Sequence, residues 1–179
     1  VLNRAGLHID ASSGFEAHRA LRAGVPPSHI LLTAQQQPED LSALLAQGVG
    51  FNAGSLRQLN LFGERYPGRE VTIRINPGLG SGHNNRTNVG GPASSFGIWH
   101  SDLDRVPEIQ TKHDLKITRL HTHIGSGADP QIWEHCAQLS LNIASRLPDV
   151  QTVNLGGGFK VGRMPDEPSA DLQKIGHRV

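Results

Sequence analysis

The sequence predicts an α/β protein that contains about six of the eight βα units of a (β/α)8 TIM barrel. Aliphatic runs of strand length alternate with amphipathic segments of helix length, which is typical of a parallel sheet. Six such units fit in 179 residues, whereas a complete barrel needs about 250 residues. A third observation, the alternation of polar and apolar residues within strands, favours a partial barrel over an open doubly wound sheet.

The segment 71–76 carries the clearest alternation. Its odd-numbered residues are apolar, while Thr72, Arg74 and Asn76 are polar. A strand buried on both faces of an open sheet should be apolar throughout. We therefore expect one face of each strand to pack on helices, and the other face to carry small or polar groups toward the barrel mouth.

Capping motifs predict where three helices begin. Ser13 to Glu16 and Ser55 to Gln58 both have the capping-box pattern, in which the serine hydroxyl and the acidic or amide side chain each accept a backbone N–H. Asp129 is the expected N-cap of the longest helix. These positions agree with the helix starts that the hydrophobic periodicity predicts.

Glycines and prolines predict the remaining boundaries, with helices ending at Gly24, Gly48 and Pro148. We expect Pro107 to weaken the helix that contains it, because proline removes a backbone donor. The expected strands are 7–11, 30–34, 49–53, 71–76, 117–123 and 150–155. The expected helices are 15–23, 38–47, 55–65, 102–111, 130–147 and 171–179, and a long polar loop is expected over 77–95.

Composition excludes several classes of protein. The formal net charge of +1 gives no broad basic field for nucleic-acid binding, and 36% hydrophobic residues argue against disorder. No apolar run approaches the roughly 18 residues of a membrane span. Cys136 is the single cysteine, which fits a reducing cytoplasm and predicts a buried side chain rather than a nucleophile. We expect a cytoplasmic protein that binds neither nucleic acid nor membranes.

If the barrel prediction holds, the carboxyl ends of the strands meet at one mouth, where active sites of such barrels lie. Those ends carry acidic, basic and anion-binding groups, and a purely structural barrel would not need them together. The residues are Asp10, Ser12, Asn52, Arg74, Asn76, His121, His123 and Asn154.

Gly156, Gly157 and Gly158 directly follow the last expected strand. Consecutive glycines leave backbone N–H groups uncovered, which is how a loop forms a nest for phosphate oxygens. Barrels commonly bind phosphate in the loops after their late strands. A flexible turn without a ligand is the alternative interpretation.

His121 and His123 are two residues apart on one strand, so both imidazoles should face inward. They could bind zinc or iron, although no further ligand cluster is evident beyond His8 and Asp10. Alternatively, one imidazole stacks on a flat cofactor while Ser126 and nearby N–H groups bind an anion. A third possibility is a pair of histidines hydrogen-bonded in a polar interior.

Arg74 should also face inward, and a buried guanidinium must be paired with an anion. The partner could be a structural carboxylate such as Asp10. A cofactor oxygen or a substrate carboxylate is the other candidate.

Taken together and in order, five motifs resemble the barrel domain of the pyridoxal-phosphate-dependent amino-acid decarboxylases of the alanine-racemase-like fold. Within that family, the second and fourth motifs look most like those of the diaminopimelate decarboxylases, which make lysine. The motifs are Asp10-Ala11-Ser12-Ser13 with Glu16, Arg74-Ile75-Asn76-Pro77-Gly78, Ser95-Phe96-Gly97-Ile98, His121-x-His123-Ile124-Gly125-Ser126 and Gly156-Gly157-Gly158-Phe159.

The resemblance implies a cofactor, pyridoxal 5′-phosphate, and a role for each matching residue. His123 would stack on the pyridine ring, and Ser126 with Gly156, Gly157 and Gly158 would hold the phosphate. Arg74 would lie near the ring oxygen, and Asp10 would lie beside the catalytic lysine. The implied reaction is decarboxylation of a basic or diamino acid, foremost meso-diaminopimelate to L-lysine and CO2, in an enzyme that is a homodimer at full length.

The resemblance also implies that residues 1–179 are an incomplete cofactor-binding barrel domain. The catalytic lysine strand is expected upstream of Val1, and the last barrel strand and a C-terminal β domain after Val179. We expect this segment alone to be inactive. Ser95 stands where the family often has lysine. Two alternatives remain open: a non-catalytic binding or regulatory relative, and a metal-dependent barrel hydrolase that uses His121 and His123.

Overall fold

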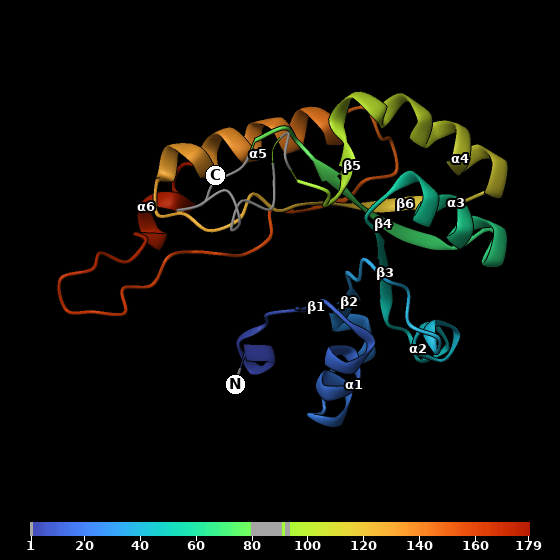
Figure 1. Cartoon of the computed structure of the whole chain (residues 1–179), viewed down its shortest axis with the longest axis horizontal. Helices are drawn as coiled ribbons and strands as arrows, with labels where there is room; N and C mark the ends of the chain where they lie inside the picture. The colour runs from blue at the N-terminus through green and yellow to red at the C-terminus, as the bar shows by residue number, and fades with distance from the viewer. Residues whose placement is uncertain (1, 80–90, 92–93) are drawn as a thin grey trace.

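A computed structural model describes residues 2–79, 91 and 94–179. Its strands form a single parallel sheet in the order β1-β2-β3-β4-β6-β7, with β5 beside β4. The sheet curls, and the helices follow the outside of the curve (Figure 1). Because the main strands follow chain order without reversal, the sheet is a half-barrel. The predicted partial barrel is confirmed, and the doubly wound alternative is wrong.

Each expected strand and helix is present, with ends that shift by a few residues. The strands are β1 (Ile9–Ala11), β2 (Ile30–Leu32), β3 (Gly50–Ala53), β4 (Glu70–Asn76), β5 (Ile98–Trp99), β6 (Lys116–Thr122) and β7 (Thr152–Asn154). The α-helices are α1 (Gly14–Arg22), α2 (Leu41–Gln47), α3 (Leu56–Arg65), α4 (Val106–His113), α5 (Pro130–Ala144) and α6 (Leu172–Gly176). Three 3-10 helices are η1 (Leu2–Ala5), η2 (Pro27–His29) and η3 (His100–Arg105).

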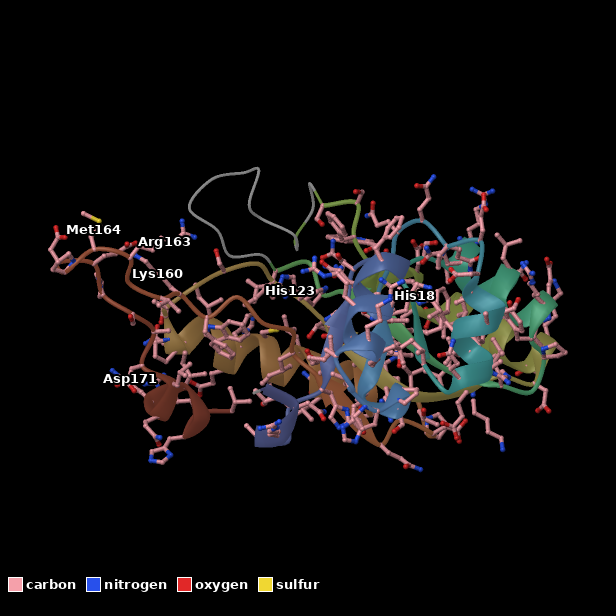
Figure 2. The ribbon with its side chains drawn as sticks, turned by 90° about the horizontal axis from the view of Figure 1, so that it is seen from below. His18, His123, Lys160, Arg163, Met164 and Asp171 are labelled. Carbon is pink, nitrogen blue, oxygen red and sulfur yellow. The ribbon has the colours of Figure 1, made fainter. Side chains whose placement is uncertain are left out.

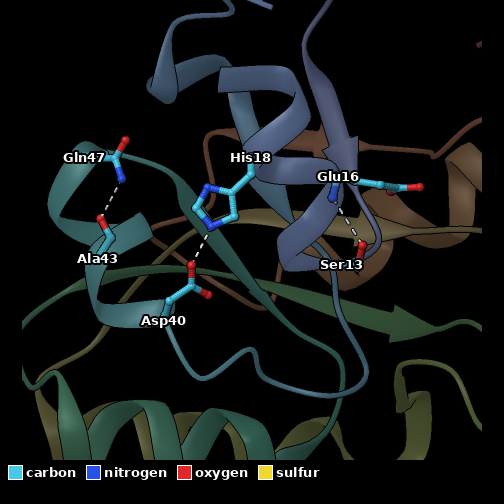
Figure 3. Close-up of polar contacts among 6 residues, drawn as sticks. All are labelled: Ser13, Glu16, His18, Asp40, Ala43 and Gln47. Carbon is cyan, nitrogen blue, oxygen red and sulfur yellow. Dashed lines mark hydrogen bonds and ion pairs between the residues drawn. The ribbon is translucent and has the colours of Figure 1, made fainter. Parts of the chain in front are cut away.

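Both predicted capping boxes begin a helix, but the reciprocal bond reaches one residue further back than expected. Ser13 Oγ accepts the Glu16 N–H (3.3 Å; Figure 3). The Glu16 carboxylate accepts the Ser12 N–H at 2.7 Å. At α3 the Gln58 side chain likewise accepts the Gly54 N–H at 2.7 Å. The residue before each N-cap is thereby tied to the helix, which fixes how the chain leaves β1 and β3.

The region around Pro107 differs from the prediction. The expected weak helix over 102–111 is instead η3 followed by α4, and Pro107 lies in the first turn of α4. A first-turn N–H has no partner within the helix, so proline removes nothing there. The short strand β5 was not expected. Of the polar loop predicted over 77–95, residues 80–90 and 92–93 lie outside the described residues.

The larger hydrophobic core fills the space between the sheet and the helices around it. Ile73 of β4 and Leu120 of β6 are fully buried, and Phe51 of β3 stacks on Phe62 of α3 with ring centroids 5.0 Å apart. The polar face of β4 is buried as well, including Arg74. The concave side of the sheet is therefore polar, and around β4 it is shielded from water.

A second, smaller cluster contains Ile124, Trp133, Cys136 and Ile175. It lies where the segments after β6 and β7 meet α5 and α6. Cys136 is free and buried, as predicted. Within the described ranges, no helix has the length and apolar character needed to cross a bilayer.

Two leucines on this frame should respond very differently to truncation. Leu120→Ala removes a fully buried side chain from the sheet, and we expect it to lower the free energy of unfolding by about 2–5 kcal/mol. Leu61 of α3 is 42% exposed, so Leu61→Ala should cost less than about 1 kcal/mol. Urea unfolding measures both values, and equal losses would contradict the packing described.

Candidate functional site

The carboxyl ends of the first and last strands of the sheet are joined across its concave side. Asn154 of β7 donates from Nδ2 to Asp10 Oδ2 of β1 at 3.0 Å, across 144 positions of sequence. The polar ends of β1 and β7 therefore converge, as expected of strand ends at a barrel mouth. This bond also orients the Asp10 carboxylate, which is otherwise exposed.

The His123 imidazole, which follows β6, packs directly on the backbone of Gly156, which follows β7. Gly156 has φ +76°, and a Cβ at this position would lie 2.4 Å from His123 Nδ1. Any side chain would therefore displace the ring. Glycine is required here both by its conformation and by the closeness of the imidazole.

The segments after β6 and β7 lie side by side. The Gly127 N–H donates to Gly158 O at 3.0 Å, and the Lys160 N–H donates to Gly127 O at 3.2 Å. A parallel bridge joins Gly127 and Phe159. A Cβ on Gly158 would lie 2.1 Å from Gly125 O, so this loop also approaches too closely for a side chain. The structure thus places the predicted triple-glycine turn against the predicted histidine loop.

The three glycines differ in how their N–H groups are used. The Gly156 N–H donates to Asn154 Oδ1 at 2.8 Å, so Asn154 fixes both Asp10 and the start of the turn. The N–H groups of Gly157 and Gly158 reach no acceptor in the described part of the chain, and both residues are exposed. Two of the three expected donors are thus open to an anion, and Ser126 is exposed on the neighbouring loop.

Arg74 of β4 is 9% exposed, and its guanidinium carbon lies 4.9 Å from the centre of the Phe96 ring. The side chain makes no ion pair with any described residue, so Asp10 is not its structural partner. Burial lowers the pKa of Arg74, and the negative charge of Asp10 partly offsets this effect. A buried cation of this kind is a strong site for an anion or an electron-rich oxygen.

Arg74 lines a cavity of about 260 Å³ between β3, α3 and the segment that leads into β5. Asn52 lies on its wall, and Asn52 Oδ1 is a buried acceptor without a partner among the described residues. Ser95, the departure from the expected lysine, lines the same cavity with Phe96. The cavity is polar where Arg74 and Asn52 face it.

His121 lies deeper than His123 and is held by Asn52. Its Nδ1 accepts a hydrogen bond from Asn52 Nδ2 at 2.7 Å, and the two histidine rings are 6.4 Å apart. Burial lowers the pKa of His121 to about 3, and the charges of Arg74 and His123 act in the same direction. Burial and then Arg74 also lower the pKa of His123, while Asp10 opposes the shift. Both imidazoles are therefore neutral at physiological pH.

The predicted metal alternative lacks a ligand set. Across residues 2–79, 91 and 94–179, no three His, Cys, Asp or Glu side chains are grouped so that they could hold a metal ion. His8 instead stacks on His29, with ring centroids 4.2 Å apart, and Asp10 is bonded to Asn154. Of the pair, His121 is hydrogen-bonded to Asn52 and His123 packs on Gly156.

Two residues make contacts in the site that the sequence did not assign to them, although Asn154 was expected at the mouth and Phe96 belongs to a matching motif. Asn154 bridges Asp10 and the Gly156 N–H, and Phe96 stacks on Arg74. The position of Asn154 just before the triple glycine was a usable signal, because Asn side chains commonly bond the backbone two residues on. Phe96 carried no such local signal.

Known proteins are similar to this chain along nearly its whole length. The model of the pyridoxal-binding domain of pyridoxal-dependent decarboxylases matches residues 1–179. A diaminopimelate decarboxylase of Streptomyces coelicolor is 36% identical over 97% of this chain and 41% of its own length. That of Escherichia coli K12 is 34% identical over 97% of this chain and 43% of its own length.

Solved structures give the same result. A crystal structure of a diaminopimelate decarboxylase superposes with a TM-score of 0.88 at 31% identity, covering 99% of this chain and 44% of the other. An arginine decarboxylase from Paramecium bursaria Chlorella virus shares the fold, with a TM-score of 0.75 at 20% identity over 96% of this chain and 46% of the other. The chain spans less than half the length of the relatives it matches.

The glycine turn offers a matched pair of variants. Gly156→Ala places a methyl group 2.4 Å from His123 Nδ1 at positive φ, so we expect it to lower the free energy of unfolding by about 2 kcal/mol or more. Gly157→Ala meets no atom within 4 Å and should change stability by less than about 1 kcal/mol. Denaturant unfolding compares them, and a tolerated Gly156→Ala would refute the close packing.

The buried His121 predicts a pH dependence of stability. Its folded pKa of about 3 lies below the ordinary value of 6.5, so the unfolded state takes up the proton first as the pH falls. Stability should then decrease by about 1.4 kcal/mol per pH unit through this window. His121→Gln cannot take up that proton, and unfolding measured from pH 6.5 downward should show a shallower slope.

The exposed His135 of α5 provides the control for this prediction. His135→Gln should leave the slope of stability against pH unchanged. A His121→Gln slope equal to that of the unsubstituted protein would mean that the buried imidazole is not the group that titrates.

Proposed function

The chain belongs to the pyridoxal-dependent decarboxylases, whose pyridoxal-binding domain it matches along its length, and on that basis we propose that it forms the pyridoxal 5′-phosphate site of an enzyme that decarboxylates meso-diaminopimelate to L-lysine. The packing of His123 on Gly156, beside the open N–H groups of Gly157 and Gly158, carries this proposal. The names of the relatives at 36% and 34% identity support the substrate.

The residues present fit a flat, phosphorylated aromatic group. Gly157 and Gly158 offer two backbone donors in a turn that is free of side chains, and Ser126 adds a hydroxyl nearby, which together suit a phosphate. Arg74 is a buried cation without a carboxylate partner in the described structure, and it suits the phenolic oxygen of the ring. The neutral His123 ring suits stacking.

When bound, pyridoxal phosphate supplies an electron-accepting ring for the electrons that the departing carboxylate leaves behind. The residues of this chain contribute orientation and electrostatics. Arg74 provides a fixed positive charge, and the Asn154 amide holds the Asp10 carboxylate toward the concave side. Because these groups are already in position, no reorganisation is needed at the moment of reaction.

The catalytic lysine of this reaction is proposed to lie outside residues 1–179. Lys160 forms an ion pair with Glu167 at 3.1 Å, and Lys112 lies 3.9 Å from Glu64 on the outer helices. Lys116 begins β6 at the end opposite the mouth, and Lys174 is on α6. The relatives are more than twice as long as this chain, which is enough for a lysine strand, a last barrel strand and a second domain. We extend the proposal to a cytoplasmic homodimer in which residues 1–179 alone are inactive.

Decarboxylation by the full-length protein tests this function. We expect CO2 release from meso-diaminopimelate that stops when pyridoxal phosphate is removed and returns when it is restored, and that exceeds release from ornithine, arginine or lysine. Arg74→Gln should lower kcat/KM by about tenfold or more, because it removes a charge-assisted contact. Arg22→Gln, at an exposed arginine near the end of α1, is the matched control.

Two outcomes would contradict the proposal. Tight binding of pyridoxal phosphate without CO2 release from any of the four amino acids would favour the non-catalytic relative. Activity that persists without the cofactor and is lost on chelation would favour a metal-dependent enzyme.

A further inference from the structure

Trp133 of α5 is 1% exposed and is among the largest side chains that the fold buries completely. Its indole stacks on Phe159, with ring centroids 4.4 Å apart and an angle of 28° between the rings. Phe159 directly follows Gly158 and is 40% exposed. The stack therefore attaches the end of the glycine turn to a buried helix residue.

Trp133 also contacts the neighbouring loop. Its Nε1–H points to Gly127 O at 3.5 Å, the same carbonyl that accepts the Lys160 N–H. Gly127 in turn donates to Gly158 O. One side chain thus touches both segments that form the anion-binding end of the site.

These contacts belong to a core that is separate from the main one. The smaller cluster joins Ile124 of the histidine loop, Trp133 and Cys136 of α5, and Ile175 of α6, with Leu155 packed against it. The segment after β6 contributes Ile124, next to His123, and the segment after β7 contributes Leu155, next to Gly156. Packing in this cluster therefore decides how the loops sit relative to each other.

Among the described residues, the end of the glycine turn is otherwise tied by backbone hydrogen bonds to Gly127, whose carbonyl Trp133 itself contacts. Glycine loses more conformational freedom on ordering than any other residue, and beyond Phe159 the chain leaves on a projecting segment that carries Lys160, Arg163 and Met164 (Figure 2). Without the contacts of Trp133 to Phe159 and Gly127, the N–H groups of Gly157 and Gly158 would be held in direction less firmly. Donors that are fixed in advance bind a ligand more tightly, because the ordering cost is already met by the fold.

We propose that Trp133 is a positioning residue for phosphate binding: by holding Phe159 and Gly127, it aims the N–H groups of Gly157 and Gly158 at the phosphate of the cofactor. Trp133 itself does not contact the phosphate. This inference rests on the proposed function, because it assumes that the ligand is pyridoxal phosphate.

The test compares binding of pyridoxal phosphate with binding of unphosphorylated pyridoxal by equilibrium dialysis of the cofactor-free, full-length protein. The ratio of the two affinities isolates the contribution of the phosphate. Trp133→Leu and Phe159→Leu each remove the ring stack, and we expect each to lower that ratio by about tenfold, the value of one charge-assisted hydrogen bond. Affinity for pyridoxal should stay within about twofold.

Two further variants separate positioning from general stability. Phe62→Leu removes a buried aromatic ring of the larger core, which stacks on Phe51, and should reduce stability without changing the affinity ratio. Trp133→Phe keeps an aromatic face for Phe159 and should keep most of the ratio. If Trp133→Leu does not fold, Phe159→Leu decides the question, because Phe159 is partly exposed and its truncation spares the core.

The outcomes separate the two proposals. If the unsubstituted protein prefers pyridoxal phosphate and both leucine variants keep that preference, the positioning role of Trp133 is wrong while the proposed function stands. If the unsubstituted protein binds neither compound, or binds both equally, the proposed function itself fails.

Discussion

The site depends on the absence of a side chain at Gly156, which lets the His123 imidazole rest on the backbone of the following turn. A Cβ would lie 2.4 Å from His123 Nδ1, so the contact exists only because position 156 is glycine at positive φ. From this contact, the loops after β6 and β7 become neighbours, and Gly127 can bond Gly158. The aromatic face and the open backbone donors then lie side by side, as a phosphorylated ring requires.

Among the described residues of the site, Arg74 carries the positive charge. Arg74 is buried without an ion pair to any described residue, while burial keeps His121 and His123 neutral. A cation in a poorly hydrated interior interacts strongly with an incoming oxygen, because little water competes for it. Because the two imidazoles are neutral, they do not add to the positive charge of Arg74. A neutral His123 ring also suits stacking.

Local patterns in the sequence predicted the partial barrel, which the structure confirms, while the binding roles of the site residues stay predictions. The alternation within 71–76 indicated a polar concave face, and the triple glycine indicated an anion loop. Contacts between distant segments had no such signal. The Asn154–Asp10 bond joins residues 144 apart, and the two-residue β5 is too short to show an alternating pattern and is defined by its pairing with β4. The stack of Phe159 on the buried Trp133 likewise joins two segments that are distant in sequence.

A crystal structure of the full-length protein grown with pyridoxal phosphate tests the central claim most directly. The phosphate should lie within hydrogen-bond distance of the Gly157 and Gly158 nitrogens, with the pyridine ring against His123 and its oxygen toward Arg74. Phosphate density in another part of the fold, with His123 facing solvent, would contradict the site described for this chain.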